Sequence, residues 1–409
     1  MVEAAVAATQ LILSVPTRSF QGHKNTVSAV AVFPDGRRIV MSSHDQLRLW
    51  DLTWTNGVML KKMEGHSSSV RAVTVSRDGQ FIASGDVNGK LIIWSGDTGT
   101  PVSTRAISAH TDRLRSLDFS PDGTILATGS KDKSAKLWNT KTWEMHGKPI
   151  DCGTRATCVR FSPTIGELTL AIATDRHIEI WDIRTWICIA KLESAFHAGN
   201  CSLVWTPDGT RLLSGGSTWN PTIREWDTST WQPVGDPWVG HTAYIDALAI
   251  SPNGRLVVSA SDDNHVRLWR RSDRRTIAIF MHSQPVSCVT FSIDGKHVFS
   301  GGRDVKMSEW AVPEDALLLA PRKDTLLSVP PKERDPDVSS HLIRRWHPLI
   351  LYQEAWRESN AQEQTTASVM KESSYSFGAN DYSTLMLHVD LPYGFDGPPC
   401  MHYWGSADG

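Results

Sequence analysis

The sequence predicts an all-β protein built from seven copies of one unit, each copy holding about four short strands. Three observations predict it. A tryptophan recurs seven times at nearly constant spacing, a histidine precedes most of these tryptophans, and tight-turn signals flanked by alternating apolar residues lie between the two. Apolar alternation with period two around Asp-Gly or Asn-Gly is typical of β-hairpins. We therefore expect a repeat protein whose copies share one local structure.

The tryptophans define the period. They stand 41 to 45 residues apart, at Trp50, Trp94, Trp138, Trp181, Trp226, Trp269 and Trp310. The upstream histidines are His23, His66, His110, His197, His241 and His282. One copy reads RLRSLDFSPDGTILATGS over 113–130, which is a hairpin around a PDG turn, and a second turn precedes the tryptophan in SKDKSAKLW. Two hairpin turns per copy give the four strands.

A Gly-His…Trp frame with this period resembles the WD-repeat (WD40) family over residues 17–311. The resemblance implies a seven-bladed β-propeller with four-stranded antiparallel blades. In that family each repeat supplies the outer strand of one blade and the three inner strands of the next. TRSF at 17–20 should then be the outer strand of the last blade, paired with the strand ending VKMSEW at 305–310, so that the ring closes without a free edge. Residues 1–16 are expected to lead into this strand.

Composition favours a protein without a strong overall field. Lys and Arg number 42 against 44 Asp and Glu, which gives no reason to expect nucleic acid or an anionic membrane as partner. The six cysteines show no C-x-x-C or zinc spacing and indicate reduced thiols of a cytoplasmic or nuclear protein. AAVAATQLILSV near the start has Glu3 in place of a basic flank, unlike a signal peptide. We expect no cofactor, no metal and no small-molecule substrate.

The resemblance assigns the recurring His, Ser or Thr, Asp and Trp to a structural tetrad inside each blade. Asp accepts a hydrogen bond from His, His from the hydroxyl, and the hydroxyl from the indole N–H, so that each buried polar group has a partner. A hydrolase triad is the alternative, but a catalytic site occurs once and this set recurs around a ring. The complete tetrads are His110, Thr128, Asp132 and Trp138; His241, Ser259, Asp263 and Trp269; and His282, Ser300, Asp304 and Trp310.

Four repeats depart from this pattern. The first has Asp45 as its acid, the second has Asn88 where Asp is usual, and the fifth has Asn220 beside an insertion. The fourth has Cys152 for the His and Ala171 for the hydroxyl, and keeps Asp175 and Trp181. Blade four is therefore predicted to be the weakest. Two explanations of these departures are open: ordinary sequence drift, or an opening in the ring that serves a function.

A second set of tryptophans follows the repeat tryptophans, in the turn to the outer strand. These are Thr53-Trp54, Thr142-Trp143, Thr185-Trp186 and Thr230-Trp231. Packing between neighbouring blades is one interpretation, and an exposed aromatic binding surface on the wide face is the other.

The family binds partners mainly on its narrow face, around the central channel. The positions that reach this face are three and five residues after the repeat His, and the residue before the tetrad Asp. On blades two to four they form a basic arc of Arg71, Arg113, Arg115, Lys131 and Arg155. Opposite lies an acidic-aromatic arc of Trp219, Tyr244, Asp246 and Asp262, and blade seven adds Arg303. These charges either bind a partner or solvate loop ends.

Residues 312–409 carry no repeat. Their first part is rich in Pro and charge, as in a linker, and most of the rest is expected to be disordered. An apolar stretch at 341–356 is a possible short helix, either a docking motif or part of a ragged end.

The sequence favours a non-catalytic protein–protein interaction scaffold. The expected ligand is a partner protein, or an acidic or phosphorylated peptide, on the narrow face. An enzyme using the channel is the alternative class, and no phosphate loop, metal spacing or nucleotide fingerprint supports it. Nucleic-acid binding through the basic arc is a minor third possibility.

Overall fold

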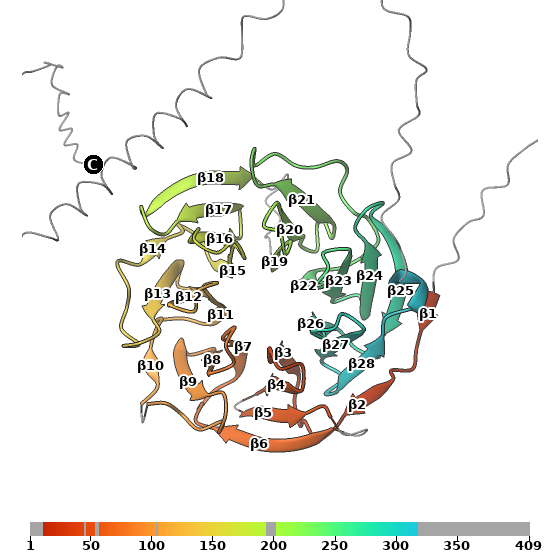
Figure 1. The fold of residues 1–409 in the computed structure, drawn as a ribbon, viewed down its shortest axis with the longest axis horizontal. Coiled ribbons are helices and arrows are strands. Elements are labelled where there is room, and N and C mark those ends of the chain that lie inside the picture. Colours follow the sequence, from red (N-terminus) through yellow and green to blue (C-terminus); the bar gives the residue numbers. More distant parts are fainter. Residues whose placement is uncertain (1–10, 45, 54–56, 104, 194–201, 318–409) are drawn as a thin grey trace, which may run out of the picture. The chain divides into compact units, whose positions relative to one another are not determined.

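Seven small sheets stand around a central opening like the blades of a propeller (Figure 1). This computed structural model describes residues 11–44, 46–53, 57–103, 105–193 and 202–317. The chain divides into two units, Met1–Lys323 and Asp324–Gly409, and all described residues belong to the first. The expected tail and the possible helix at 341–356 lie outside the described residues.

The strands follow the predicted order, four to a repeat. Blade one holds β3 (Val27–Val32), β4 (Arg38–Ser43), β5 (Gln46–Asp51) and β6 (Val58–Glu64). Blade two holds β7 (Val70–Val75), β8 (Phe81–Asp86), β9 (Lys90–Ser95) and β10 (Ile107–Ser108). Blade three holds β11 (Leu114–Phe119), β12 (Ile125–Ser130), β13 (Ser134–Asn139) and β14 (Ile150–Asp151). Blade four holds β15 (Ala156–Phe161), β16 (Thr169–Thr174), β17 (His177–Asp182) and β18 (Ile187–Glu193).

The last three blades vary this plan. Blade five has three strands in the described part of the chain, β19 (Ser202–Trp205), β20 (Arg211–Gly215) and β21 (Ile223–Asp227). Blade six holds β22 (Ile245–Ile250), β23 (Leu256–Ser261), β24 (His265–Arg270) and β25 (Arg275–Met281), with β1 (Leu11–Leu13) as a fifth strand. Blade seven holds β26 (Val286–Phe291), β27 (His297–Gly302), β28 (Met307–Ala311) and β2 (Arg18–Phe20), and one helical turn, α1 (Glu314–Leu317), follows it.

The two ends of the repeat region meet in blade seven, as predicted. β2 pairs antiparallel with β28, with Arg18 opposite Glu309. Arg18 Nη2 donates to Glu309 Oε1 at 2.9 Å, and Phe20, 1% exposed, packs edge-on against Trp50 of blade one. The all-β seven-bladed architecture and its closure by the N-terminal strand are confirmed.

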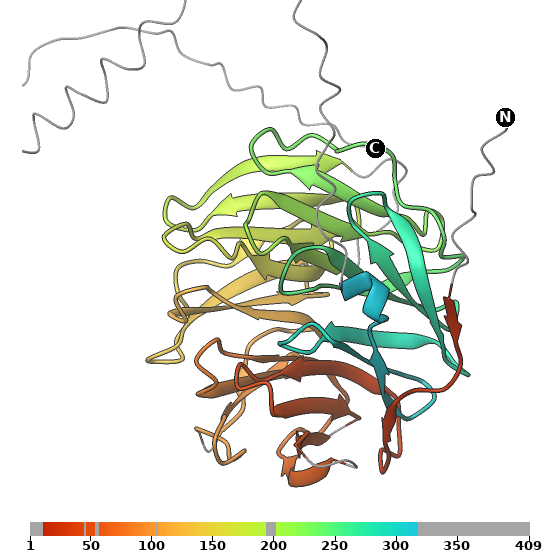
Figure 2. The same cartoon turned by 45° about the vertical axis from the view of Figure 1, so that its right-hand side comes forward.

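A second N-terminal strand was not predicted. β1 pairs in parallel with β25, with Leu11 opposite Ala278, and so adds to the outer edge of blade six before the chain crosses to blade seven. Figures 1 and 2 show β1 and β2 running along the rim beside strands from the far end of the repeat region. The N-terminal segment therefore ties two adjacent blades together.

The core is a ring of layers between blades. Each of seven buried apolar clusters in the described ranges joins two neighbouring blades. In one of them Phe33 and Leu47 of blade one contact Val70, Ile82 and Trp94 of blade two. Successive side chains of a strand point to opposite faces of its blade. Both faces carry apolar residues because each face packs against a neighbouring blade.

The tryptophans of the Thr-Trp pairs pack at these seams. Trp143 meets Phe81 edge-on at 5.2 Å between ring centroids, and Trp231 meets Trp205 in the same way at 6.1 Å. Trp186 lies against His146. All three are partly buried, which favours the packing interpretation over an exposed aromatic surface; Trp54 lies outside the described residues.

Candidate functional site

The inner strands place one residue each at the mouth of the central channel. The register of six inner strands shifts by one residue near its start, for example between Leu114 and Ser116 of β11, which leaves Arg115 unpaired. A bulge of this kind turns the extra residue out of the ladder. With Ser202 at the start of β19, the bulged residues form a channel ring of Ser28, Arg71, Arg115, Thr157, Ser202, Asp246 and Ser287.

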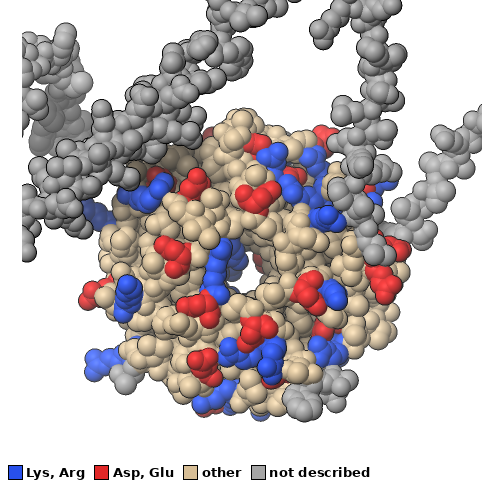
Figure 3. Space-filling view, in the orientation of Figure 1, with Lys and Arg blue, Asp and Glu red and all other residues tan. Residues whose placement is uncertain are grey.

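The channel ring lines a cavity of about 600 Å³. Thr26, Tyr244, Asp262 and Arg303 also line this cavity, and a second, apolar set comes from the same strands two residues further on: Val30, Val73, Leu117, Leu248 and Val289. Figure 3 shows the opening at the centre of the ring with basic side chains on one of its walls. The cavity is thus polar at the ring positions and apolar beside them.

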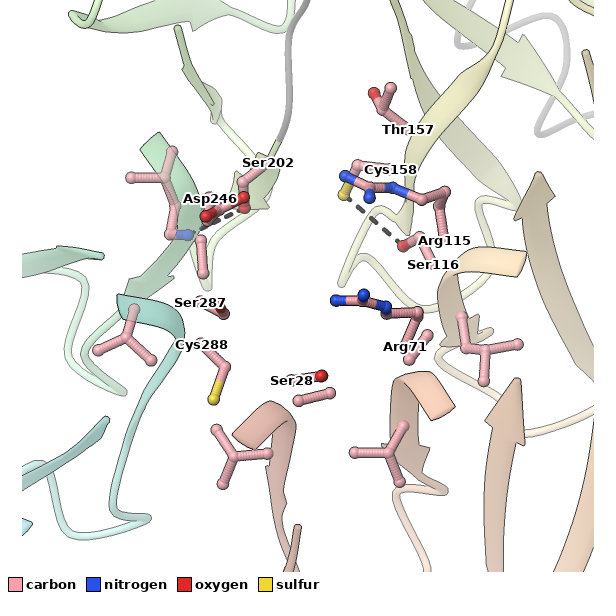
Figure 4. A pocket seen from close by; sticks show the side chains of 18 of the residues that line it. Ser28, Arg71, Arg115, Ser116, Thr157, Cys158, Ser202, Asp246, Ser287 and Cys288 are labelled. Carbon is pink, nitrogen blue, oxygen red and sulfur yellow. Dashed lines mark hydrogen bonds between the residues drawn. The ribbon is translucent and has the colours of Figure 1, made fainter. Parts of the chain in front are cut away.

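Charge is distributed unevenly around the channel ring. Arg71 and Arg115 come from neighbouring blades two and three, and Asp246 comes from blade six, three blades away in either direction. Figure 4 shows Asp246 on the wall opposite the two arginines. Within the described ranges, no hydrogen bond or ion pair joins the side chains of Arg71, Arg115 or Arg303 to another residue. No described side chain therefore accepts a hydrogen bond from these three guanidiniums, although Asp246 and Asp262 line the same cavity.

The surroundings of these groups shift their protonation. Burial, and then the neighbouring Asp262, raises the pKa of Asp246 to about 7, although Arg115, Arg303 and Arg71 act in the opposite direction. Burial lowers the pKa of Arg71, and the nearby guanidiniums of Arg115, Arg113 and Arg303 add to this effect. Both shifts show charge placed in a partly desolvated space.

Only some residues of each predicted arc line the cavity. The cavity brings together Arg71, Arg115, Tyr244, Asp246, Asp262 and Arg303. Its lining does not include Arg113, Lys131, Arg155 or Trp219. Arg155 Nε donates to Asp175 Oδ2 at 2.6 Å, and Trp219 is 90% exposed in the loop between β20 and β21. Lys131 stays near the basic group: burial, Arg113, Arg115 and Arg155 lower its pKa.

The hydroxyl members of the channel ring were missed by sequence reasoning. Ser28, Thr157, Ser202 and Ser287 stand five residues after His23, Cys152, His197 and His282, the same offset that gives Arg71 and Arg115. The same offset from the repeat position therefore identifies these hydroxyl residues.

The tetrad side chains are linked by hydrogen bonds in blades three, six and seven. In blade three, His110 Nδ1 lies 2.9 Å from Asp132 Oδ2 and Nε2 lies 2.8 Å from Thr128 Oγ1, and Trp138 Nε1 donates to the same hydroxyl at 3.1 Å. Blades six and seven repeat these three contacts with His241, Ser259, Asp263 and Trp269, and with His282, Ser300, Asp304 and Trp310. Each buried polar atom in the set is satisfied.

The expectation for blade two is corrected. Asp86, two residues before Asn88, supplies the acid: its Oδ2 lies 2.9 Å from His66 Nδ1. His66 Nε2 meets Ser84 Oγ at 2.7 Å, and Trp94 Nε1 donates to that hydroxyl at 2.8 Å. The carboxylate at the end of β8 reaches the histidine, so the blade keeps a complete tetrad.

Blades one and five are described in part. Burial and, less strongly, Arg48 lower the pKa of His23 to about 4; its expected partner Asp45 lies outside the described residues. In blade five Trp226 Nε1 donates to Ser214 Oγ at 3.1 Å, and His197 lies outside the described residues. Asn220 Oδ1 accepts from Thr222 Oγ1 at 3.0 Å.

Blade four replaces the tetrad with a network around Glu179. Trp181 Nε1 donates to Glu179 Oε2 at 2.9 Å, and His177 Nε2 and Lys191 Nζ lie 2.8 and 3.0 Å from Oε1. Burial raises the pKa of Glu179, but the bonds from His177, Lys191 and Trp181 outweigh it and the net shift is downward. The acid for Trp181 therefore comes from the same strand, and Asp175 pairs with Arg155 instead.

Replacing Glu179 by Ala is expected to lower the free energy of unfolding by about 2 kcal/mol, because the indole N–H of the half-buried Trp181 loses its acceptor. Urea unfolding measures this. Glu193→Ala, at the exposed end of β18, is the matched control and should change stability by less than about 0.5 kcal/mol. Equal losses in the two variants would contradict the role given to Glu179.

In the described part of the chain, no group of three or more His, Cys, Asp or Glu side chains is placed to hold a metal ion. The same residues include no helix long and apolar enough to cross a membrane.

A closed ring of seven blades, with His-hydroxyl-Asp-Trp tetrads inside four of them, defines a WD-repeat propeller. Six segments match the WD40 family, described as "WD domain, G-beta repeat": 14–51, 57–95, 99–139, 187–227, 231–270 and 274–304. The chain belongs to this family. The unmatched stretch at 140–186 contains Cys152, Ala171 and Glu179, the departures of blade four.

Three relatives show how far the similarity extends. The small ribosomal subunit protein RACK1y of Oryza sativa subsp. japonica is 33% identical over 324 residues, 71% of this chain and 94% of that protein. Nuclear distribution protein PAC1 of Arthroderma otae is 24% identical over 186 residues, 40% of each chain. Protein groucho of Drosophila melanogaster is 23% identical over 150 residues, 37% of this chain and 20% of that protein. The chain thus spans less than half the length of the last two.

Proposed function

We propose that this protein is a non-catalytic interaction scaffold that binds an acidic or phosphorylated segment of a partner protein on the narrow face of the propeller. The observation that carries the proposal is the group of unpaired arginines at the channel, Arg71, Arg115 and Arg303. The relative named as a small ribosomal subunit protein supports membership of a larger assembly, and we place the protein in the cytoplasm or the nucleus.

An acidic partner relieves the repulsion within the basic group. Burial lowers the pKa of Arg71 and of Lys131, and the neighbouring guanidiniums of Arg113 and Arg115 lower both further. A carboxylate or phosphate would accept charge-assisted hydrogen bonds from the guanidiniums, which are stronger than neutral ones. Association driven in this way is expected to weaken as salt rises.

Catalysis is not proposed, because the residues that could suggest it are already used. The Ser or Thr, His and Asp of each tetrad bond to one another and to a buried Trp in four blades. A nucleophile fixed in this way has no access to a substrate.

The test reverses the basic group. We expect Arg113→Glu with Arg115→Glu to abolish partner capture and leave the melting temperature almost unchanged, because both side chains are at the surface or the channel mouth. Affinity purification with mass spectrometry, at two salt concentrations, compares this variant with the unaltered protein.

Arg275→Glu, at the exposed start of the outer strand β25, is the matched control and should capture the same partners. Asp262→Lys should also be tolerated if the ligand lies on the basic arc alone. Unchanged capture by the double reversal would place the binding surface elsewhere.

A further inference from the structure

The channel ring places two arginines and a carboxylate around one cavity. Arg71 and Arg115 lie side by side on adjacent blades, and Asp246 faces them across the same cavity (Figure 4). A fixed carboxylate opposite an anion site opposes the binding of an anion as long as it is ionised. The cavity therefore links the occupancy of the arginines to the charge on Asp246.

We infer that the channel holds a site for one tetrahedral oxyanion, a phosphoryl or sulfate group, between Arg71 and Arg115, and that its binding is accompanied by the uptake of one proton by Asp246. The inference rests on the proposed function in taking a phosphorylated group as the natural ligand, but the site itself is defined by this chain alone.

The arginine wall fits such a group. Each guanidinium offers a planar fork of N–H donors that matches the oxygens of a phosphoryl group. Neither fork is used by another described side chain, and the bulges of β7 and β11 aim both into the cavity. Ser28, the ring residue of the blade next to Arg71, adds a hydroxyl that also lines the cavity.

Asp246 is the group whose protonation responds. It faces Arg71 on β7, Arg115 on β11, Arg303 after β27 and its own neighbour Asp262 after β23. Tyr244 and Cys288 also line the cavity, and burial raises the pKa of Cys288 to about 12, so this thiol stays neutral. The arginines stay charged over the useful pH range. The carboxyl of Asp246 is thus the group that changes charge near neutrality.

The direction of the pH dependence follows. With a pKa of about 7, Asp246 is mostly neutral at pH 6 and mostly ionised at pH 8. An anion on the opposite wall raises this pKa further, so binding at pH 8 requires a proton and is weaker. One proton changes the affinity by at most tenfold per pH unit. Affinity should therefore be level below pH 6 and fall as pH rises through 7.

Serine is the natural replacement for the test, because it occupies the same ring position in blades one, five and seven as Ser28, Ser202 and Ser287. The probe is sulfate, whose charge is constant between pH 6 and 8, titrated into the full-length protein at fixed ionic strength. Isothermal titration calorimetry in two buffers of different ionisation enthalpy gives both the affinity and the number of protons taken up.

We expect sulfate to bind about tenfold more tightly at pH 6 than at pH 8, with close to one proton taken up at pH 8. Asp246→Ser should bind equally at both pH values and as tightly as the unaltered protein at pH 6. Arg71→Ser with Arg115→Ser should lose binding. Arg275→Gln, at the exposed start of the outer strand β25, is the matched control and should change neither affinity nor proton uptake.

Sulfate binding that survives the double arginine replacement would overturn the site. Binding that is independent of pH, or unaffected by Asp246→Ser, would overturn the proton coupling. A short phosphoserine peptide and free inorganic phosphate, compared at pH 6, distinguish a phosphorylated partner from a free anion as the source of the group.

The result separates this inference from the proposed function. Proton-coupled sulfate binding together with partner capture that survives Arg113→Glu and Arg115→Glu supports the oxyanion site and overturns the narrow-face scaffold. If Arg113→Glu with Arg115→Glu abolishes partner capture and sulfate binding coupled to proton uptake is not found, the result supports the narrow-face scaffold and overturns the oxyanion site.

Discussion

A chain lacking residues 1–21 is expected to aggregate, or to melt far below the full-length protein. The deletion removes β2 and so leaves the outer edge of β28 open. It also removes Phe20, which is 1% exposed, and the arginine that pairs with Glu309, itself 1% exposed. The loss of a buried Phe and of the arginine paired with a buried carboxylate, which keeps His297 at 3.8 Å as its other basic neighbour, should together lower stability by more than about 5 kcal/mol. Size-exclusion chromatography with light scattering and a thermal melt measure the effect.

Deletion of residues 1–14 is the control. It removes β1 alone, and β25 keeps its antiparallel partner β24, so this shorter deletion should leave a folded monomer with a modest loss. If the longer deletion were also monomeric with an unchanged melting temperature, the closure of the ring by β2 would be wrong.

Asp132→Ala and Asp263→Ala are each expected to lower the free energy of unfolding by roughly 1–3 kcal/mol, because a buried histidine loses its partner. Ala171→Ser should have a smaller effect, since the tryptophan of that blade already has Glu179 as acceptor. Chemical unfolding at pH 7 gives all three values. Equal losses would mean that the tetrad is misplaced.

The Asp263 variant also has a pH signature. Burial raises the pKa of Asp263, but the bond and charge of His241, with Thr242 and His265, outweigh it and leave the pKa at about 2, below its ordinary 3.8. The folded state is thus favoured above pH 4, and this contribution is lost as the pH falls toward 2. Asp263→Ala should therefore lose less stability between pH 5 and pH 2.5 than the unaltered protein does.

Most of the fold could be predicted from the sequence, because the same pattern of strands, turns and a tryptophan recurs in successive repeats. A turn or a tryptophan that is unclear in one copy is clear in the next, and the offset between repeat and blade led directly to the pairing of β2 with β28. β1 could not be found in this way. Leu11–Leu13 belongs to no repeat, and its parallel pairing with β25 depends on where the tertiary structure brings two distant segments.

The site was predicted less completely, and the reason lies in the backbone. The offset from the repeat histidine gives Arg113 and Arg115 equally, but the bulge of β11 turns only Arg115 into the cavity. The sequence also does not reveal which charges are paired. Asp175 stands at the position of a tetrad acid, but in the structure it forms an ion pair with Arg155. Asp86 shows the reverse case, because an acid outside the expected position reaches the histidine.

The joining of both ends in blade seven has a consequence for the order of synthesis. Arg18 and its partner Glu309 are 291 positions apart, so at about 5–20 residues per second the first strands wait roughly 15–60 s for their partners to leave the ribosome. β1 waits almost as long for β25. During this interval six blades can form, while two short strands and the open edges they will cover stay unpaired. The ring is therefore closed when β28 captures a strand that was made much earlier, and until then the unpaired strand edges can pair with other chains.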